Sequence, residues 1–182
     1  MKGNPPDYLE VLRRVKTALN RSQFPHFNLK PMQVKCLEYI LKGQDVIAVV
    51  PTGYGKSLMF HLLPYFLPVK KARNMIIVVC PLNEIIEDQL KALTTRGITA
   101  NSFAFTGQHD SVELLFSTSS RINEDDGKLQ IPDDILNGRC SIIFAHPEAL
   151  LSEEGSKLMA SQVYQENVVA CVIDEAHCVE LC

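Results

Sequence analysis

The segment that most constrains the fold is an apolar run that leads directly into a glycine-containing loop, DVIAVVPTGYGKS at residues 45–57. Residues 46–50 are all apolar and mostly β-branched, which predicts a strand buried on both faces. Strands of this kind belong to parallel sheets that helices cover on both sides. This one segment therefore favours an α/β fold.

The loop after this predicted strand has the composition of a phosphate-binding loop. Gly53 and Gly55 let the backbone bend so that successive N–H groups point into one concavity, which suits a polyphosphate. Lys56 can then reach the β- and γ-phosphates, and the Ser57 hydroxyl can ligate Mg²⁺ at the positive end of the following helix. The strict pattern has glycine where this chain has Val50, so the loop is a variant, and a glycine-rich turn that binds nothing is the alternative. The expected nucleotide-binding residues of the loop are Thr52, Gly53, Tyr54, Gly55, Lys56 and Ser57.

Length and composition restrict the class of protein. The 182 residues suit one domain with a sizeable core, and no apolar run reaches membrane-spanning length, so no membrane association is expected. The amino terminus MKGNPPDYLEV has no hydrophobic signal core, so secretion is not expected. The net charge of −3 gives no basic field typical of nucleic-acid binding, which counts modestly against such a function.

The cysteines are expected to be thiols in a reducing compartment. Cys80 and Cys171 lie in or beside apolar strand-like runs, which predicts small buried side chains. Cys178 and Cys182 are four residues apart, but a zinc site normally needs a second pair of ligands. Metal binding by these cysteines is therefore not expected.

Strand and helix signals alternate along the rest of the chain, which predicts a mainly parallel sheet flanked by helices. Further strands are expected at 75–80, 98–105, 141–145 and 168–173. Helices are expected at 8–20, from 31 to Gly43, at 58–63 before the disrupting Pro64, at 84–95 and from Pro147 to about 158, with a helical turn at 133–136. Residues 1–23 are interpreted as an amino-terminal helical segment and 24–182 as the main lobe. A polar insertion at about 108–131, with a short helical piece near 112–116, interrupts this lobe.

A second candidate motif follows the predicted strand 168–173, which runs directly into Asp174-Glu175-Ala176-His177. Ligands of parallel sheets bind at the carboxyl ends of strands, so one site can contain this motif and the glycine loop. Asp174 can hold Mg²⁺ through a water molecule opposite Ser57, and Glu175 can accept a proton from the water that attacks the γ-phosphate. An ordinary turn at a strand end is the alternative for the Asp-Glu pair alone.

Gln33 is a candidate for base recognition because a primary amide can donate to and accept from an adenine edge. Considered by itself, it is more simply interpreted as a surface glutamine.

Five segments together resemble RecQ-type DNA helicases of superfamily 2, in the right order over most of the chain. They are FNLKPMQ at 27–33, PTGYGKS at 51–57, CPLNEIIEDQ at 80–89, FAHPEAL at 144–150 and DEAHC at 174–178. The resemblance implies the RecA-like lobe of a P-loop NTPase and an ATP-driven 3′→5′ translocase that separates duplex DNA. It implies ATP and Mg²⁺ as cofactors and DNA as a partner.

The resemblance also implies roles for individual residues. Lys56 and Ser57 would bind phosphate and Mg²⁺, Asp174 would hold the metal through water, and Glu175 would activate the attacking water. His177 would relay the nucleotide state to the DNA-binding side. Gln33 would read adenine, with Lys30 packing on the base. The residues implied to line the path of DNA are Pro81, Leu82, Asn83, His146, Pro147 and Glu148.

The chain departs from the family at several positions. Lys30 stands where arginine is usual, His26 where tyrosine is frequent, and Cys80 where serine is frequent. Stacking on the base should be weaker because lysine lacks the planar guanidinium. The sequence given ends at Cys182, where the family continues into a second RecA-like lobe that carries an arginine finger. We therefore expect the 182 residues to bind ATP·Mg²⁺ weakly and not to unwind DNA unaided.

Two other functions remain open at the level of sequence. One is a truncated, non-catalytic fragment that binds nucleotide or DNA, and the other is a different phosphate-loop enzyme such as a small-molecule kinase. The sequence shows no evident lid segment, which counts against the kinase. A small-molecule kinase should have no affinity for single-stranded DNA, so that affinity would distinguish a motor lobe from a kinase. The implied role on genomic DNA favours the nucleus if the source is eukaryotic and the cytoplasm otherwise.

Overall fold

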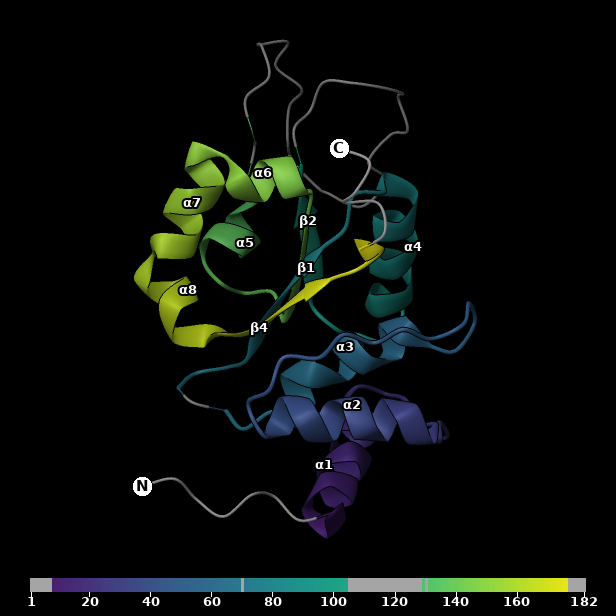
Figure 1. The fold of residues 1–182 in the computed structure, drawn as a ribbon. Helices are drawn as coiled ribbons and strands as arrows, with labels where there is room; N and C mark the ends of the chain where they lie inside the picture. Colours follow the sequence, from purple (N-terminus) through teal and green to yellow (C-terminus); the bar gives the residue numbers. More distant parts are fainter. Residues whose placement is uncertain (1–7, 70, 105–128, 130, 177–182) are drawn as a thin grey trace.

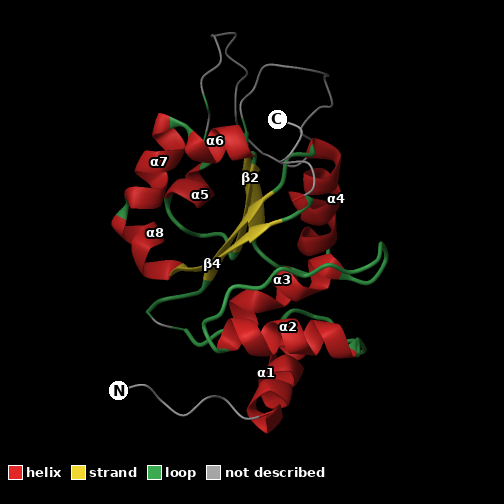
Figure 2. Ribbon diagram, in the orientation of Figure 1, coloured by secondary structure: helices red, strands yellow, loops and turns green. Residues whose placement is uncertain are grey.

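The computed structural model describes residues 8–69, 71–104, 129 and 131–176, which form a parallel sheet with helices on both faces (Figures 1 and 2). The sheet has four strands in the order β2-β3-β1-β4, and every pair of neighbours is parallel. The strands are β1 (Met75–Val79), β2 (Ala100–Phe103), β3 (Ile142–Ala145) and β4 (Val168–Ile173). The predicted α/β architecture is therefore confirmed.

The helices begin and end largely where local signals place them. Pro31 opens the second helix, since its missing N–H would have no intrahelical partner at that position. The Ser152 hydroxyl accepts a hydrogen bond from the Gly155 N–H at 3.0 Å and so caps the seventh helix. The helices are α1 (Tyr8–Arg21), α2 (Pro31–Leu41), α3 (Lys56–Phe66), α4 (Asn83–Thr94), α5 (Asp133–Leu136), α6 (Pro147–Leu151), α7 (Glu153–Ala160) and α8 (Gln162–Asn167).

Alternate residues of the central strand β1 face two different hydrophobic clusters. Ile76 and Val78 belong to the cluster that also contains buried side chains of α1, α3 and α4. Met75 and Ile77 belong to the cluster with Ile135 of α5 and the helices that follow β3. Both faces of the strand are therefore buried, as its uniformly apolar sequence predicts.

The predicted strand at 46–50 is wrong, because these residues form neither strand nor helix. The side chains of Ile47 and Val49 are 94% and 91% exposed, whereas those of Val46, Ala48 and Val50 are half-buried. A strand needs a hydrogen-bonded neighbour, and no strand of the described part of the chain pairs with this segment. Apolar composition alone was therefore not sufficient to make a strand.

Other expectations need smaller corrections. The helix expected to stop before Pro64 continues to Phe66, which is fully buried, so packing outweighs the one backbone N–H donor that Pro64 removes from the helix. The helix expected from Pro147 to about 158 is divided into α6 and α7, and α8 follows. Cys80 is buried as predicted, but Cys171 is exposed, because its side chain belongs to neither of the two hydrophobic clusters that cover the faces of the sheet.

Some of the predicted features fall on residues that the structure does not describe. The helical piece expected near 112–116 and most of the polar insertion lie outside the described residues, as do Cys178 and Cys182. None of the described helices has the length and apolar character to cross a membrane.

Candidate nucleotide site

The glycine loop, residues 51–57, follows the 46–50 segment and includes the first two residues of α3. Gly53 and Gly55 have φ angles of 73° and 94°, in the left-handed region that side chains with a Cβ disfavour. A Cβ on Gly55 would also lie 2.8 Å from Nε2 of Gln33. Backbone conformation and close packing therefore both require glycine at position 55, immediately before the α3 amino terminus.

Gln33 is tied to this loop. Its side chain is 2% exposed, and its Nε2 donates to the carbonyl oxygens of Tyr54 at 3.2 Å and Gly55 at 2.9 Å. Its Oε1 accepts a hydrogen bond from the Lys30 backbone N–H at 2.7 Å. The interpretation of Gln33 as a surface glutamine is therefore wrong. The sequence could indicate the amide chemistry but not that the amide would contact residues 21 and 22 positions away.

The glycine loop and the Asp-Glu motif meet at one place. The Lys56 ammonium lies 3.3 Å from Oε1 of Glu175, and the two side chains are 37% and 19% exposed. The Asp174 N–H donates to the Val79 carbonyl at 2.9 Å, so the turn after β4 is held against the end of β1. Lys56 and Glu175 are 119 positions apart in the sequence. They meet because Lys56 begins α3 and Glu175 follows β4, whose carboxyl end lies beside that of β1.

The turn at Asp174-Glu175 has an unusual backbone. Glu175 has a φ of 52°, which is uncommon for a residue with a side chain. Oδ1 of Asp174 accepts a hydrogen bond from the Glu175 N–H at 3.0 Å, which supports this conformation. Strained backbone of this kind is concentrated at functional sites.

The Asp174 carboxyl is suited to a cation. Burial raises its pKa, the hydrogen bond from the Glu175 N–H lowers it, the neighbouring Glu175 charge raises it and the Lys56 charge lowers it. A divalent cation would offset both the burial and the Glu175 charge, and so favour the ionised form. No group of three or more His, Cys, Asp or Glu side chains gathers among the described residues. Mg²⁺ fits this sparse set because it keeps several waters and uses few protein carboxylates.

A second side-chain pairing adjoins the loop. The Lys30 ammonium lies 4.4 Å from the centroid of the Tyr54 ring. Sequence reasoning assigned both residues to the nucleotide site but missed their contact with each other. His26 and Thr52 are exposed, and Ser57 is half-buried in the first turn of α3. His177 lies outside the described residues.

The six candidate DNA-contacting residues are brought together at the same edge of the sheet. Because β1 and β3 are neighbours, the segments that follow them, 81–83 and 146–148, lie side by side. Nε2 of His146 and Oδ1 of Asn83 are 2.7 Å apart, and the Cys80 N–H donates to the Ala145 carbonyl at 3.0 Å. Burial lowers the pKa of His146, and the charge of Glu148 raises it by a smaller amount. The lowered pKa favours a neutral imidazole, whose Nε2–H donates to Oδ1 of Asn83.

Comparison with known proteins extends over most of the chain. The family model for DEAD/DEAH box helicases matches residues 30–181. In an alignment 182 residues long, the chain is 30% identical to the ATP-dependent helicase SGS1 of Saccharomyces cerevisiae; the alignment covers 98% of this chain and 11% of that protein. It is 30% identical to the ATP-dependent helicase wrn-1 of Caenorhabditis elegans over 159 residues, or 86% of this chain and 12% of that protein.

A bacterial relative gives the same result. The chain is 27% identical to the ATP-dependent DNA helicase RecQ of Haemophilus influenzae over 165 residues, which is 90% of this chain and 23% of that protein. The chain therefore spans between 11% and 23% of the length of these three relatives. The chain belongs to the DEAD/DEAH box helicase family, and these homologues within it are RecQ-family helicases.

Proposed function

We propose that this chain binds ATP·Mg²⁺ and DNA as the first motor lobe of an ATP-hydrolysing 3′→5′ DNA helicase. The observation that carries the proposal is the 3.3 Å contact between Lys56 of the glycine loop and Glu175 after β4. A phosphate-binding lysine and a candidate general base must both reach the same triphosphate, and they do so only if their loops adjoin. The relatives named as ATP-dependent helicases support the reaction class.

Each residue of the site has one proposed task. Lys56 and the N–H groups of the glycine loop bind the phosphates, where the amino terminus of α3 adds positive potential. Ser57 and Asp174 hold Mg²⁺, which neutralises charge on the phosphates when it is bound. Glu175 orients and deprotonates the attacking water. His177 is proposed to couple this site to the DNA side, on the resemblance alone.

Base recognition is assigned to Gln33 with Lys30. The Gln33 amide is fixed next to the glycine loop by its bonds to Tyr54 and Gly55, so it can report the occupancy of the base site to the phosphate site. Reading an adenine edge requires the amide to exchange at least one of these bonds. Lys30 and Tyr54 would then lie beside the base as a cation and a ring.

DNA is proposed to pass along the 81–83 and 146–148 segments. Their polar groups lie at the carboxyl edge of the sheet, where β1 separates β3 from the Asp174 turn. Backbone and side-chain donors at such an edge suit phosphate contacts that carry no sequence preference. A eukaryotic source would make the nucleus the expected location of this activity.

Full turnover is proposed to require a second lobe. An arginine finger supplied by such a lobe is typically worth about 10³–10⁵ in turnover. The 182 residues alone are therefore expected to bind nucleotide with slow hydrolysis and no unwinding. Brisk DNA-stimulated turnover by the 182 residues would contradict this part of the proposal.

The test compares Lys56→Ala with Lys16→Ala, because Lys16 is an exposed lysine of α1 away from the glycine loop. Binding of a fluorescent ATP analogue is measured with and without Mg²⁺. Lys56→Ala should weaken binding at least roughly tenfold, since a charge-assisted contact to phosphate is lost, and Lys16→Ala should not change it. Glu175→Gln should keep binding while removing residual hydrolysis. Equal affinities of the Lys56→Ala and unaltered chains would refute the assignment of the nucleotide site.

A further inference from the structure

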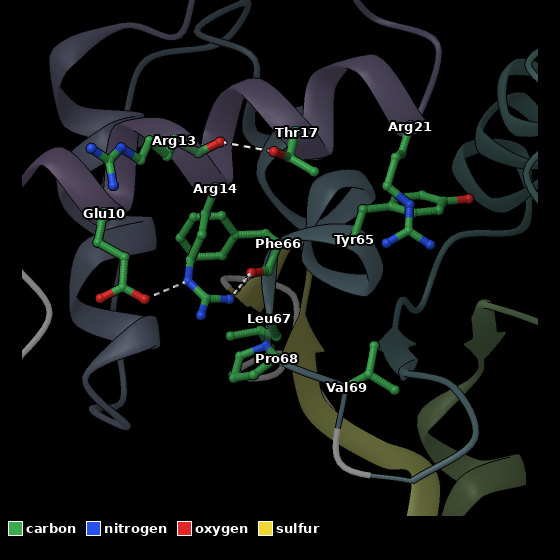
Figure 3. A pocket seen from close by; sticks show the side chains of 10 residues that line it. All are labelled: Glu10, Arg13, Arg14, Thr17, Arg21, Tyr65, Phe66, Leu67, Pro68 and Val69. Carbon is green, nitrogen blue, oxygen red and sulfur yellow. Dashed lines mark hydrogen bonds and ion pairs between the residues drawn. The ribbon is translucent and has the colours of Figure 1, made fainter. Parts of the chain in front are cut away.

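A basic groove lies between α1 and the carboxyl end of α3 (Figure 3). One wall consists of polar and charged side chains of α1, and the other is the end of α3 with the chain that follows it. Its lining residues are Glu10, Arg13, Arg14, Thr17, Arg21, Tyr65, Phe66, Leu67, Pro68 and Val69. Three arginines thus share one groove in a chain whose net charge is −3.

The periodicity of α1 explains why these arginines lie together. Thr17 is four residues from both Arg13 and Arg21 and three from Arg14, so all four side chains lie on one side of the helix. The buried residues of α1, Val11 and Val15 among them, occupy a different stripe that packs into the core. The core therefore fixes which side of α1 turns toward the end of α3.

Arg14 already has structural partners. Its Nε donates to Oε1 of Glu10 at 2.9 Å, and its Nη1 donates to the carbonyl oxygen of Phe66 at 3.3 Å (Figure 3). Phe66 is the last residue of α3, whose final carbonyl groups carry partial negative charge. Arg14 and Glu10 thus join α1 to α3.

Arg13 and Arg21 are differently placed. The Arg21 guanidinium lies 5.4 Å from the centroid of the Tyr65 ring, and both arginines are exposed. Neither forms an ion pair with an acidic side chain within the described part of the chain. As far as the described residues extend, no carboxylate neutralises these two guanidinium groups, so both can contact an anionic ligand.

We propose that this groove binds the phosphodiester backbone of a nucleic acid, with Arg13 and Arg21 contacting separate phosphates. Guanidinium groups match phosphate oxygens with paired N–H donors. Positions 13 and 21 are about 12 Å apart along the helix axis, which is too far for both side chains to hold the same phosphate in the same way and so favours separate phosphates. The proposal rests on the proposed function for the choice of polymer and adds a contact region to it.

An acidic peptide is the less favoured ligand. A bound peptide normally needs pockets for apolar side chains as well as charge. Among the lining residues only Val69 exposes much of a large aliphatic side chain, at 51%, while Phe66 is fully buried. The groove offers an aromatic ring and guanidinium groups instead, a combination typical of nucleic-acid surfaces.

The groove is separate from the site at the other end of α3. This helix runs from Lys56 in the glycine loop to Phe66 in the groove, a length of about 16 Å. Variants of the groove can therefore be tested without altering a residue of the nucleotide site or of the 81–83 and 146–148 segments.

The experiment measures fluorescence anisotropy of a fluorescein-labelled oligothymidine and of a duplex of equal length, over a range of salt concentrations. The variant Arg13→Gln/Arg21→Gln is compared with Lys16→Gln/Lys35→Gln, which removes the same charge at exposed positions outside the groove. The arginine variant should bind about tenfold more weakly. Its dependence of log K on log salt should be shallower by about 1.4 for the single strand and about 1.8 for the duplex.

The lysine variant should bind within about twofold of the unaltered chain, because it loses charge but no direct phosphate contact. The proposal is overturned if both variants lose affinity equally, if the arginine variant binds normally, or if the unaltered chain binds polyglutamate more tightly than the oligonucleotide. Circular dichroism checks folding. If the double variant does not fold, Arg13→Gln alone should show about half the change in salt dependence.

The same samples separate this proposal from the proposed function. Binding of the fluorescent ATP analogue should be identical for the arginine variant and the unaltered chain. If the analogue binds neither chain while the arginine variant still loses oligonucleotide affinity, the nucleotide-site proposal fails and the groove proposal stands. If the analogue binds both and oligonucleotide affinity is unchanged, the groove proposal alone fails.

Discussion

The ionised Asp174 carboxylate lowers the stability of the folded chain, although its position suits the binding of a cation. It is partly buried next to another carboxylate, and its pKa is raised mainly by burial. Because the folded state binds the proton more tightly than the unfolded state, this group lowers stability as pH rises above its unfolded pKa of about 3.9. The unfavourable effect therefore grows with pH above the unfolded pKa and is larger at pH 7 than at pH 4.

Asp174→Asn should therefore increase the free energy of unfolding at pH 7. The gain should be at the low end of the roughly 0.5–2 kcal/mol that stabilising substitutions commonly give, because the carboxyl is only partly buried. The amide oxygen of Asn can still accept the hydrogen bond from the Glu175 N–H. Urea denaturation at pH 7 and pH 4 measures the effect, which should be smaller at pH 4. Asp88→Asn, at an exposed position of α4, serves as control; a destabilised Asp174→Asn would contradict the electrostatic argument.

At this scale the sequence predicted the chemistry of the residues better than their contacts. Lys56 and the Asp174-Glu175 pair were identified because each follows an apolar run at a position where parallel sheets bind ligands. The contacts of Gln33 with Tyr54 and Gly55 could not be predicted, since they depend on how α2 packs beside the glycine loop. The Lys30–Tyr54 pair was missed for the same reason, and the Arg21–Tyr65 pair because it depends on how α1 packs against α3.

Among the elements, the 46–50 segment and the four strands show what apolar composition can and cannot predict. Four of the five expected strands are present, because their apolar residues meet helices on both faces or a neighbouring strand. The 46–50 run is equally apolar, yet it pairs with no strand of the described chain. Apolar composition reports a tendency to be buried, whereas strand formation also requires a backbone partner.

Ile47→Thr/Val49→Thr should therefore have little effect on stability. Both side chains are more than 90% exposed, so replacing them removes little buried area, and the change should be within about 0.5 kcal/mol. Ile76→Ala, in the fully buried centre of β1, should cost about 2–5 kcal/mol. Chemical denaturation measures all three proteins. A large loss in the threonine variant would mean that the 46–50 segment is packed in solution.

On the scale of the whole molecule, α1 joins the principal core although it precedes the region matched by the model of the helicase family. Four of its residues, Val11, Val15, Ala18 and Leu19, are at most 7% exposed and lie in the same cluster as Ile76 and Val78 of β1. The family match begins at residue 30. The boundary expected between residues 23 and 24 stays a prediction. Because α1 shares its hydrophobic cluster with β1, the two sides of that boundary are expected to depend on each other for stability.

Removal of residues 1–23 should destabilise the whole chain. Burial of Val and Leu side chains contributes about 1.5–3 kcal/mol each, so losing three of them and exposing their neighbours should cost more than about 4 kcal/mol. Domains of this size are typically stable by only about 5–15 kcal/mol, so the thermal midpoint should fall steeply or the protein should aggregate. Val11→Ala/Leu19→Ala should reproduce part of the loss, and Leu9→Ala, at a position 62% exposed on the same helix, should not. Differential scanning calorimetry distinguishes the outcomes: an unchanged midpoint after the deletion would mean that α1 is a separable segment and that residues 24–182 hold their core without it.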